Sequence, residues 1–358
     1  MENSNWERLK WLWKSFLELK KKSYPLAILG TRLVISSLAS VPFANLAIHL
    51  LIPDGFIIQE IQLSANDLSV YSLIISSIVL VIGGCLIYID INKLHNQARK
   101  TAKVFITGML GTSKRFPTEL LSHSEKTDAR ESIELSIPES DDYSLSKQIE
   151  IYNAELIVRL YERFILHHDC DKIYLGGLAR IPFLVAYGAC FRAVSAKVIY
   201  FDRFHRGGEW ALLNDEDKNI TLSTFDINNV IVGENGDIGL AVCFSTPIQE
   251  EHLPPFIREN IIFLTPNTAS ERNLVNNQEN IHRISETIQQ IIDGLSNKKN
   301  CKKVHLFLSV QSTLALDIGK RYQEGIHKNW VIHNFDASLG EYNWAIELSK
   351  NGISKYQN

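Results

Sequence analysis

The sequence lacks the short motifs that mark the common classes of enzyme. It contains no GxSxG elbow, no Walker loop, no HExxH pair and no CxxC pair. The five cysteines have neither paired nor metal-like spacing, which is typical of a reducing compartment: Cys85, Cys170, Cys190, Cys243 and Cys301. For the one metal-like cluster, HHDC at 167–170, a solvated helix end is favoured, because adjacent histidines point to different faces. We therefore expect no catalytic centre, no metal and no cofactor.

Charge is absent from one long run and nearly absent from another. Residues 68–89 carry none, and 33–52 contain His49 as their only titratable side chain. As helices, these runs span about 30–33 Å, which matches a hydrocarbon core of about 30 Å. Core helices of globular proteins rarely continue so far without a charged face. Two transmembrane helices, 26–52 and 68–89, are therefore favoured over a pair of buried core helices, with 53–67 as the connecting loop.

The residues before the first run are rich in tryptophan. A cleaved signal peptide is an alternative for that run, since SLASVPFA at 37–44 offers a cleavage site, but signal peptides begin with a short basic segment. We favour an uncleaved anchor. Within 1–25, Trp6, Trp13 and apolar neighbours share one helical face, which predicts an interfacial amphipathic helix. The alternative is a soluble helix that packs on the C-terminal domain.

Lysine and arginine flank both runs but are absent between them. Residues 1–25 contain six lysines and arginines, whereas the charged residues of the loop 53–67 are all acidic. Basic residues return after the second run, from Lys93 to Arg115. The positive-inside rule then places both ends of the chain in the cytoplasm and the loop outside.

Small residues form a stripe on the second run. They would allow helices to approach closely in lipid, and we expect them to pack membrane helices, within or between chains: Ser69, Ser72, Ser76 and Gly83. Two spans of one chain cannot enclose a pore, so a channel would need several chains.

The remainder of the chain alternates strand-like and helical segments. We expect a juxtamembrane helix and linker over 90–130 and an α/β domain of layered sheets over 131–358, in two halves of about 131–230 and 231–358. β-rich runs are expected at 132–137, 172–175, 197–201, 239–245, 260–264, 303–308 and 330–335. Helices are expected near 146–168, 182–193, 276–295 and 312–324.

An internal repeat supports the two halves. CDKIYLGGLARIPFLVAYGACF (170–191) aligns without gaps to CKKVHLFLSVQSTLALDIGKRY (301–322), so that Gly188 meets Gly319. Three inserted residues later, Phe201-Asp202 meets Phe335-Asp336, and Trp210 meets Trp344. Two copies of one Rossmann-like unit would stack with pseudo-twofold symmetry and leave a crevice between them.

The loops after the repeated strands are the candidate ligand site. Ligands of open α/β sheets bind beyond the carboxyl ends of strands, where helix N-termini offer free N–H groups. The two loops supply Gly176, Gly177, Arg180, Ser309, Gln311 and Ser312, with Ser312 as the expected N-cap. Polar and aromatic residues follow the next strands: Arg203, Phe204, His205, Tyr342 and Trp344. These groups can hold phosphates and stack on bases, although well-capped helices and a core tryptophan explain some of them equally.

Net charge limits the size of the ligand. Residues 116–358 hold 24 Lys and Arg against 33 Asp and Glu, a net charge of −9. A polymeric nucleic acid needs a basic face, so we expect neither DNA nor long RNA as a partner. A small anion held by backbone N–H groups and one or two arginines remains compatible with this charge.

The C-terminal third resembles the end of a SAVED domain. The resemblance rests on KVHLFLSVQSTLALDIGKRYQEG (303–325), WVIHNFD (330–336) and EYNWAIEL (341–348). IGLAVCFSTPI (238–248) and NIIFLTP (260–266) also look like earlier strands of that family, which brings Ser245 and Thr246 into the candidate site. One position departs from the pattern, because Gln311 stands where the family commonly has proline.

The resemblance implies a fold and a function. SAVED domains are two fused CARF-like Rossmann units that sense cyclic oligonucleotides, here a cyclic di- to tetranucleotide. A partner nucleotidyltransferase of the CD-NTase type makes the ligand in bacterial CBASS anti-phage systems. Many relatives fuse the sensor to a nuclease, whereas this chain carries a membrane anchor. The resemblance therefore implies an effector of the bacterial inner membrane that assembles on ligand binding and disrupts the membrane, with no enzymatic activity of its own.

Two other functions remain open at this point. The chain could be a membrane-tethered hydrolase of cyclic nucleotides, or a passive receptor that recruits another protein. Recovery of intact ligand argues against the first, and toxicity of the chain with ligand alone argues against the second.

Overall fold

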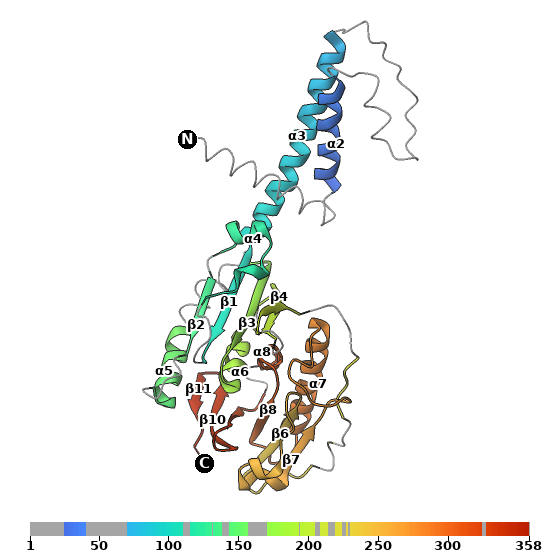
Figure 1. The fold of residues 1–358 in the computed structure, drawn as a ribbon. Coiled ribbons are helices and arrows are strands. Elements are labelled where there is room, and N and C mark those ends of the chain that lie inside the picture. Colours follow the sequence, from blue (N-terminus) through green and yellow to red (C-terminus); the bar gives the residue numbers. More distant parts are fainter. Residues whose placement is uncertain are drawn as a thin grey trace. The chain divides into compact units, whose positions relative to one another are not determined.

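A computed structural model of the chain divides into two compact units (Figure 1). The helical unit comprises Met1–Arg99 and Leu121–Ala129, and the α/β unit comprises Lys100–Leu120 and Arg130–Asn358. The structure describes residues 25–40, 70–109, 115–130, 132–137, 143–156, 170–192, 194–204, 208–213, 219–223, 227, 230–323 and 327–357. The predicted interfacial helix, the later part of the first span and the loop 53–67 lie outside these residues.

The helical unit pairs two apolar helices closely. The helices described in this unit are α2 (Pro25–Ser40), α3 (Val70–Arg99) and the short α4 (His123–Asp128). Gly30 and Gly83 meet at the contact: a Cβ on Gly83 would lie 2.7 Å from the Gly30 carbonyl oxygen. Near the start of α2, the backbone N–H of Ala27 donates to the buried carboxylate of Asp90 at 2.7 Å. This bond satisfies one of the N–H groups that a helix N-terminus leaves unpaired.

Both helices expose apolar side chains. Among the described residues, one helix, Ile74–Arg99, is long and apolar enough to cross a membrane by length and composition. The described apolar part of α2, Leu26–Ser37, is shorter. Exposed apolar side chains along the two helices are Leu26, Ile28, Leu29, Ile35, Ile74, Ile75, Ile78, Leu80, Val81, Ile82, Tyr88 and Ile89. The second predicted span is thus present as a helix, and the first is described only up to Ser40.

One member of the predicted stripe of small residues, Gly83, lies at the contact between α2 and α3. Gly83 packs against Gly30 of the same chain. Ser76 is half-buried on α3, the side chain of Ser72 is not among those described, and Ser69 lies outside the described residues. By contrast, a Cβ on Gly84 would meet no atom within 4 Å, so this neighbouring position faces open space.

The first sheet of the α/β unit has the order β2-β1-β3-β4-β5. Its strands are β1 (Thr101–Thr107), β2 (Ser132–Ser136), β3 (Lys172–Leu178), β4 (Lys197–Arg203) and β5 (Trp210–Leu212). The first four are parallel, and β5 is antiparallel to β4. Within the described part of this half, the helical segments are η1 (Thr118–Leu120), α5 (Leu145–Leu156) and α6 (Ile181–Cys190).

The second sheet has the order β11-β10-β9-β8-β6-β7. Its strands are β6 (Asp237–Cys243), β7 (Ile261–Leu264), β8 (Lys303–Ser309), β9 (Trp330–Asp336), β10 (Glu341–Ser349) and β11 (Gly352–Lys355). Strands β6 to β9 are parallel, and β10 and β11 add an antiparallel hairpin. The helical segments are η4 (Glu250–His252), η5 (Pro255–Asn260), α7 (Gln278–Ser296) and α8 (Ser312–Lys320). The predicted α/β class is confirmed.

One strand was missed at the junction of the two units. The expected helix over 91–112 ends at Arg99, and after Lys100 the chain enters β1. β1 lies between β2 and β3 and is hydrogen-bonded to both, with Val104 and Ile106 fully buried. Burial of these alternating apolar residues in a sheet outweighs the helical pattern that precedes them. The α/β unit therefore begins near residue 100 rather than 131. The short strand β5 and the hairpin β10–β11 were also not expected.

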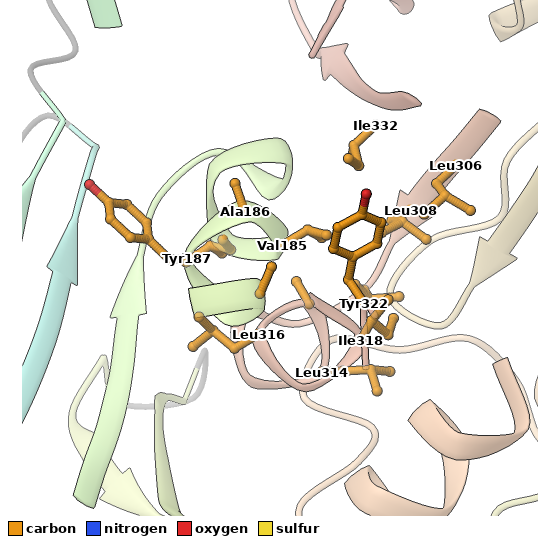
Figure 2. Close-up of a cluster of buried hydrophobic side chains, with 14 of the residues drawn as sticks. Val185, Ala186, Tyr187, Leu306, Leu308, Leu314, Leu316, Ile318, Tyr322 and Ile332 are labelled. Atoms are coloured by element: carbon orange, nitrogen blue, oxygen red, sulfur yellow. The ribbon is translucent and has the colours of Figure 1, made fainter. Parts of the chain in front are cut away.

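The repeated units meet through α6 and α8. A Cβ on Gly188 of α6 would collide with the carbonyl oxygen of Leu316, and one on Gly319 of α8 would collide with that of Val185. The repeat aligns Val185 with Leu316 as well as Gly188 with Gly319, so the two contacts are symmetry-related. Figure 2 shows Val185 directed toward Leu308 and Tyr322 of the second half, while Tyr187 leaves α6 on the other side, toward the first sheet. The crevice expected between the halves begins at the N-terminal ends of these two helices.

Candidate ligand-binding site

A pocket of about 660 Å³ lies at the carboxyl ends of the parallel strands of both sheets. The first half contributes side chains from β3, β4 and the start of α6, and the second half contributes the ends of β8 and β9 and the start of α8. The lining residues are Met109, Leu178, Ala179, Arg180, Ile181, Asp202, Arg203, Phe204, Gly208, Ser245, Arg272, Asn273, Leu308, Val310, Gln311, Ser312, Asn334 and Phe335. The pocket thus forms where parallel α/β sheets generally bind ligands.

Three arginines and one carboxyl group set the charge of the pocket. Arg180 occupies the N-cap position of α6, Arg203 ends β4, and Arg272 follows β7. The Nε of Arg203 donates to the Gly208 carbonyl oxygen at 3.0 Å, which fixes the position of its guanidinium group. Among the described residues that line the pocket, Asp202 is the only acidic one. The pocket is therefore locally positive, which suits an anionic ligand.

The side chain of Asp202, which ends β4 together with Arg203, lies at the N-terminus of α8. Its Oδ2 accepts from the Thr313 hydroxyl at 3.1 Å and from Gln311 Nε2 at 3.4 Å, and its Oδ1 accepts from the Arg203 N–H at 2.8 Å. Burial raises the pKa of Asp202 to about 6, because these bonds and one from the Thr313 N–H offset only part of the loss of water. A carboxylate of the first half therefore caps the helix of the second. Ser312, expected as the N-cap, is instead the first residue of α8, and Gln311 holds the N-cap position.

Gln311 fixes one wall of the pocket. Its Oε1 accepts from the backbone N–H of Val275 at 3.0 Å, and its Nε2 donates to the carbonyl oxygen of the same residue at 2.8 Å. This pairing holds the segment that carries Arg272 and Asn273, and Asn273 Nδ2 donates to the Arg203 carbonyl oxygen at 3.4 Å. Both ends of the Gln311 amide are thus used within the protein, although the residue lines the pocket.

The turn after β6 is held by the end of β8. The carbonyl oxygen of Ser309 accepts from the N–H groups of Phe244 and Ser245, and its hydroxyl accepts from the Thr246 N–H at 3.0 Å. These bonds place Ser245 in the lining. Ser309 and Thr246 support the turn and do not line the pocket.

Six of the predicted ligand residues line the pocket: Arg180, Arg203, Phe204, Ser245, Gln311 and Ser312. Four others lie elsewhere. Gly176 and Gly177 were expected in a loop, but β3 continues to Leu178, and a Cβ on either would collide with the backbone of a neighbouring strand. Tyr342 is buried against Phe307 at a ring distance of 4.9 Å, and Trp344 packs on Phe183 at 6.0 Å. His205 lies outside the described residues.

Several lining residues were missed from the sequence, chiefly Asp202, Arg272, Asn273, Asn334 and Phe335. Asp202 and Phe335 could have been found from the repeat, which aligned Phe201-Asp202 with Phe335-Asp336. Arg272 and Asn273 come from the loop before α7, which the repeat does not include. Asn334 reads as an ordinary polar residue inside an apolar strand.

Comparison with known proteins identifies a domain family. Residues 159–348 match the model of the SMODS-associated and fused to various effectors sensor domain, SAVED. No curated protein matches the chain.

Solved structures with a similar fold include two Cap4 SAVED/CARF-domain containing receptors. The Acinetobacter baumannii receptor with the cyclic trinucleotide 3′3′3′-cAAA has a TM-score of 0.49 and 13% identity over 78% of this chain and 60% of that one. The Moraxella osloensis receptor has a TM-score of 0.41 and 11% identity, and the match covers 79% of this chain and 59% of that one. The chain thus spans about three-fifths of the length of these structures. Because the family match extends over more than half of its residues, the chain belongs to the SAVED family of sensor domains.

Proposed function

We propose that the pocket binds a cyclic oligonucleotide and that the chain senses this ligand in bacterial anti-phage defence. The observation that carries the proposal is the cluster of three arginines in a pocket between two repeated halves of a sensor domain. Its volume, about 660 Å³, lies within the range of about 300–1,000 Å³ that small-ligand pockets occupy. The Acinetobacter receptor is described with a cyclic trinucleotide, a ligand of this class.

The arginines and the start of α6 would hold the phosphates. The guanidinium groups of Arg180, Arg203 and Arg272 can donate paired hydrogen bonds to phosphate oxygens. The N-terminus of α8 is less suited to an anion, because the carboxyl group of Asp202 already occupies it. We therefore expect the phosphates to lie nearer α6 than α8.

Binding is tested with the full chain in lipid nanodiscs and a panel of cyclic di-, tri- and tetranucleotides. At least one ring should bind, and Arg180→Ala should weaken it about tenfold or more, since a charge-assisted hydrogen bond contributes about 1.5–3 kcal/mol. Arg192→Ala is the matched control, because it removes an arginine from the other end of α6, outside the lining. The proposal fails if no ring binds. Recovery of the bound ring intact would argue for a sensor and against a hydrolase.

The helical unit would anchor the sensor in the inner membrane, with residues 1–25 and the α/β unit in the cytoplasm. The apolar helix Ile74–Arg99, the exposed apolar side chains and the basic flanks of both runs support this topology. Reporter fusions or cysteine-reactive probes should place the loop 53–67 outside. A periplasmic signal from a C-terminal reporter would contradict the proposed orientation.

Signalling to the membrane would occur by assembly. Ligand would shift the chain to higher oligomers, which concentrates the anchors and disrupts the membrane; this requires tighter binding to the assembled state. The α/β unit begins directly after α3, since Lys100 alone separates α3 from β1. A CD-NTase-type enzyme would supply the ligand.

Assembly is tested by sizing the protein with and without the ring and by measuring depolarisation of cells that make both. Gly84→Leu is the variant of choice, because Gly84 has no neighbour within 4 Å, whereas a change at Gly83 would break the contact with Gly30. It should leave ring binding intact and reduce depolarisation if α3 packs between chains. An unchanged size distribution with full membrane damage would exclude assembly as the switch. Damage that requires another protein would favour the passive receptor.

A further inference from the structure

One polar side chain of the pocket lacks a partner. Asn334 is 3% exposed, lies near the carboxyl end of β9 and lines the pocket. Its amide Nδ2 is buried and has no hydrogen-bond partner among the described residues. Because side chains alternate along a strand, Asn334 faces the same side as Trp330 and Ile332, which pack in the core next to α6 and α8. Asn334 is thus the last buried residue of that face, next to the pocket, and Asp336 after it is half-exposed.

An unpaired amide at this place points to a ligand. Buried polar groups in folded proteins are almost always hydrogen-bonded, so an exception in a pocket calls for a partner that enters from outside. Asn334 is neutral, and the pocket already has three arginines for phosphates. A neutral amide is instead suited to the edge of a nucleobase, which offers donors and acceptors without charge.

The next residue of β9 is aromatic, and its side chain leaves the strand on the opposite face. Phe335 also lines the pocket and is 41% exposed. The rings of Tyr342 and His252 contact it at centroid distances of 5.2 and 5.5 Å with tilted planes, which fixes its orientation. Exposed aromatic rings of this kind are the platforms on which nucleobases stack.

The aligned residue of the first half behaves differently. Phe201 is fully buried and packs with Phe105, Phe116 and Trp210 at ring distances between 5.2 and 6.1 Å. The residue before it, Tyr200, donates to Asp317 inside the core. The repeat therefore offers an open ring and an unpaired amide in the second half alone, so core packing common to both halves does not explain them.

We infer that Asn334 and Phe335 form a subsite for one adenine base of the ligand. This inference rests on the proposed function and adds the identity of a base to it. The asparagine amide presents one donor beside one acceptor, which matches the N6 amino group and N7 of adenine. The corresponding edge of guanine has two acceptors, N7 and O6, and leaves the amide oxygen without a donor. A purine also covers more of the Phe335 ring than a pyrimidine does.

The experiment measures equilibrium binding to the full chain in nanodiscs. The probes are cyclic triadenylate, cyclic triguanylate, cyclic triuridylate and a triadenylate in which 7-deazaadenine replaces adenine. The variants are Asn334→Asp, which keeps the shape but removes the N–H donor, and Phe335→Leu, which removes the ring. Asn351→Ala is the control, because Asn351 lies on the exposed turn between β10 and β11. Melting of each variant without ligand shows whether it folds.

The wild-type chain should bind cyclic triadenylate more tightly than the other probes, and its 7-deazaadenine analogue about tenfold less tightly than cyclic triadenylate. This comparison needs no mutation. Asn334→Asp and Phe335→Leu should each lower affinity for the adenine ring about tenfold, and Asn351→Ala should not. If wild-type chain binds a guanine or uracil ring more tightly, or if both variants bind the adenine ring normally, the subsite is wrong while the proposed function stands. Absence of binding to every ring overturns both.

Discussion

The two halves of the α/β unit share a scaffold but differ in the residues that the scaffold presents. Each half has a strand, a helix and a second parallel strand, and the helices α6 and α8 meet through symmetry-related glycines. Among the residues that line the pocket, the first half supplies Arg180 and the carboxyl group of Asp202, whereas the second supplies Asn334 and Phe335. Duplication thus explains the pocket's position, and divergence explains its chemistry.

The helices α6 and α8 also differ in their buried residues. Asp317 of α8 is 1% exposed and accepts hydrogen bonds from Tyr200 of β4 at 2.7 Å and from Ser285 of α7, and it lies 3.1 Å from His282 Nδ1. The repeat aligns it with Ala186 of α6, whose carbonyl oxygen accepts from the Tyr152 hydroxyl at 2.7 Å. Burial alone would raise the pKa of Asp317, but these hydrogen bonds lower it to about 2. The second half therefore holds the first through a buried carboxylate.

Removal of that carboxylate should have the largest effect. Asp317→Ala leaves Tyr200, Ser285 and His282 without their shared acceptor and should cost about 3–5 kcal/mol of stability, the range for breaking a buried charged network. Denaturant unfolding of the full chain in detergent measures it. Glu286→Ala is the matched control, because Glu286 is an exposed acidic residue of α7. A loss no greater than that of the control would show that the halves are joined by apolar packing alone.

Asp202 should make stability depend on pH in the opposite sense to Asp317. Its pKa of about 6 in the folded chain lies above the ordinary 3.8, so the folded chain binds more protons between these values and loses stability as pH rises. Asp202→Asn should remove this loss, about 2 kcal/mol between pH 4 and pH 7 at 1.36 kcal/mol per unit of pKa. Unfolding at a series of pH values measures the difference.

The aligned residue provides the control for this pH dependence. Asp336 is half-exposed, and hydrogen bonds from Ser338 lower its pKa. Asp336→Asn should therefore leave the decline between pH 4 and pH 7 unchanged. If Asp202→Asn also leaves it unchanged, the carboxyl group at the α8 N-terminus is not desolvated as described.

The glycine contact should respond equally from either side. Gly188→Ala and Gly319→Ala each place a methyl group against the backbone of the other helix and should cost about 1–3 kcal/mol, the usual range for overpacking. Gly84→Ala, with open space around it, is the control. Markedly unequal losses would show that the contact is not symmetric in solution.

The smallest effect is expected at the position that corresponds to Asp317. Tyr152→Phe removes the hydroxyl that donates to the carbonyl oxygen of Ala186 and should cost about 1 kcal/mol, the net value of one neutral hydrogen bond. A loss as large as that of Asp317→Ala would make the two halves energetically alike and contradict the comparison.

Much of the α/β fold could be predicted from local pattern. The apolar runs that became β3, β6, β8 and β9, and the capped segments that became α6 and α8, were evident from their residues. β1 was not, because its seven residues directly follow a long helix and their strand form depends on pairing with β2 and β3, distant in the chain. Gly176 and Gly177 were misplaced for a related reason: close approach of neighbouring strands, rather than a loop, requires them.

The position of the pocket was predictable from the sequence, and the set of residues that line it was less so. The ends of the repeated strands pointed to Arg180 and Ser312, and both line the pocket. Asp202 and Asn334 were missed because their importance arises from burial among residues of the other half or of distant strands. No local pattern distinguishes a polar residue that will be buried in a pocket from one that will be solvated.

We propose one binding site that the two unlike halves form together. Calorimetric titration of the full chain in nanodiscs with its tightest-binding cyclic oligonucleotide tests it most directly. We expect one cyclic oligonucleotide to bind per chain, and we expect Arg180→Ala of the first half and Phe335→Leu of the second each to weaken that single site. Two independent sites per chain, or a site that only one of the two variants affects, would contradict it.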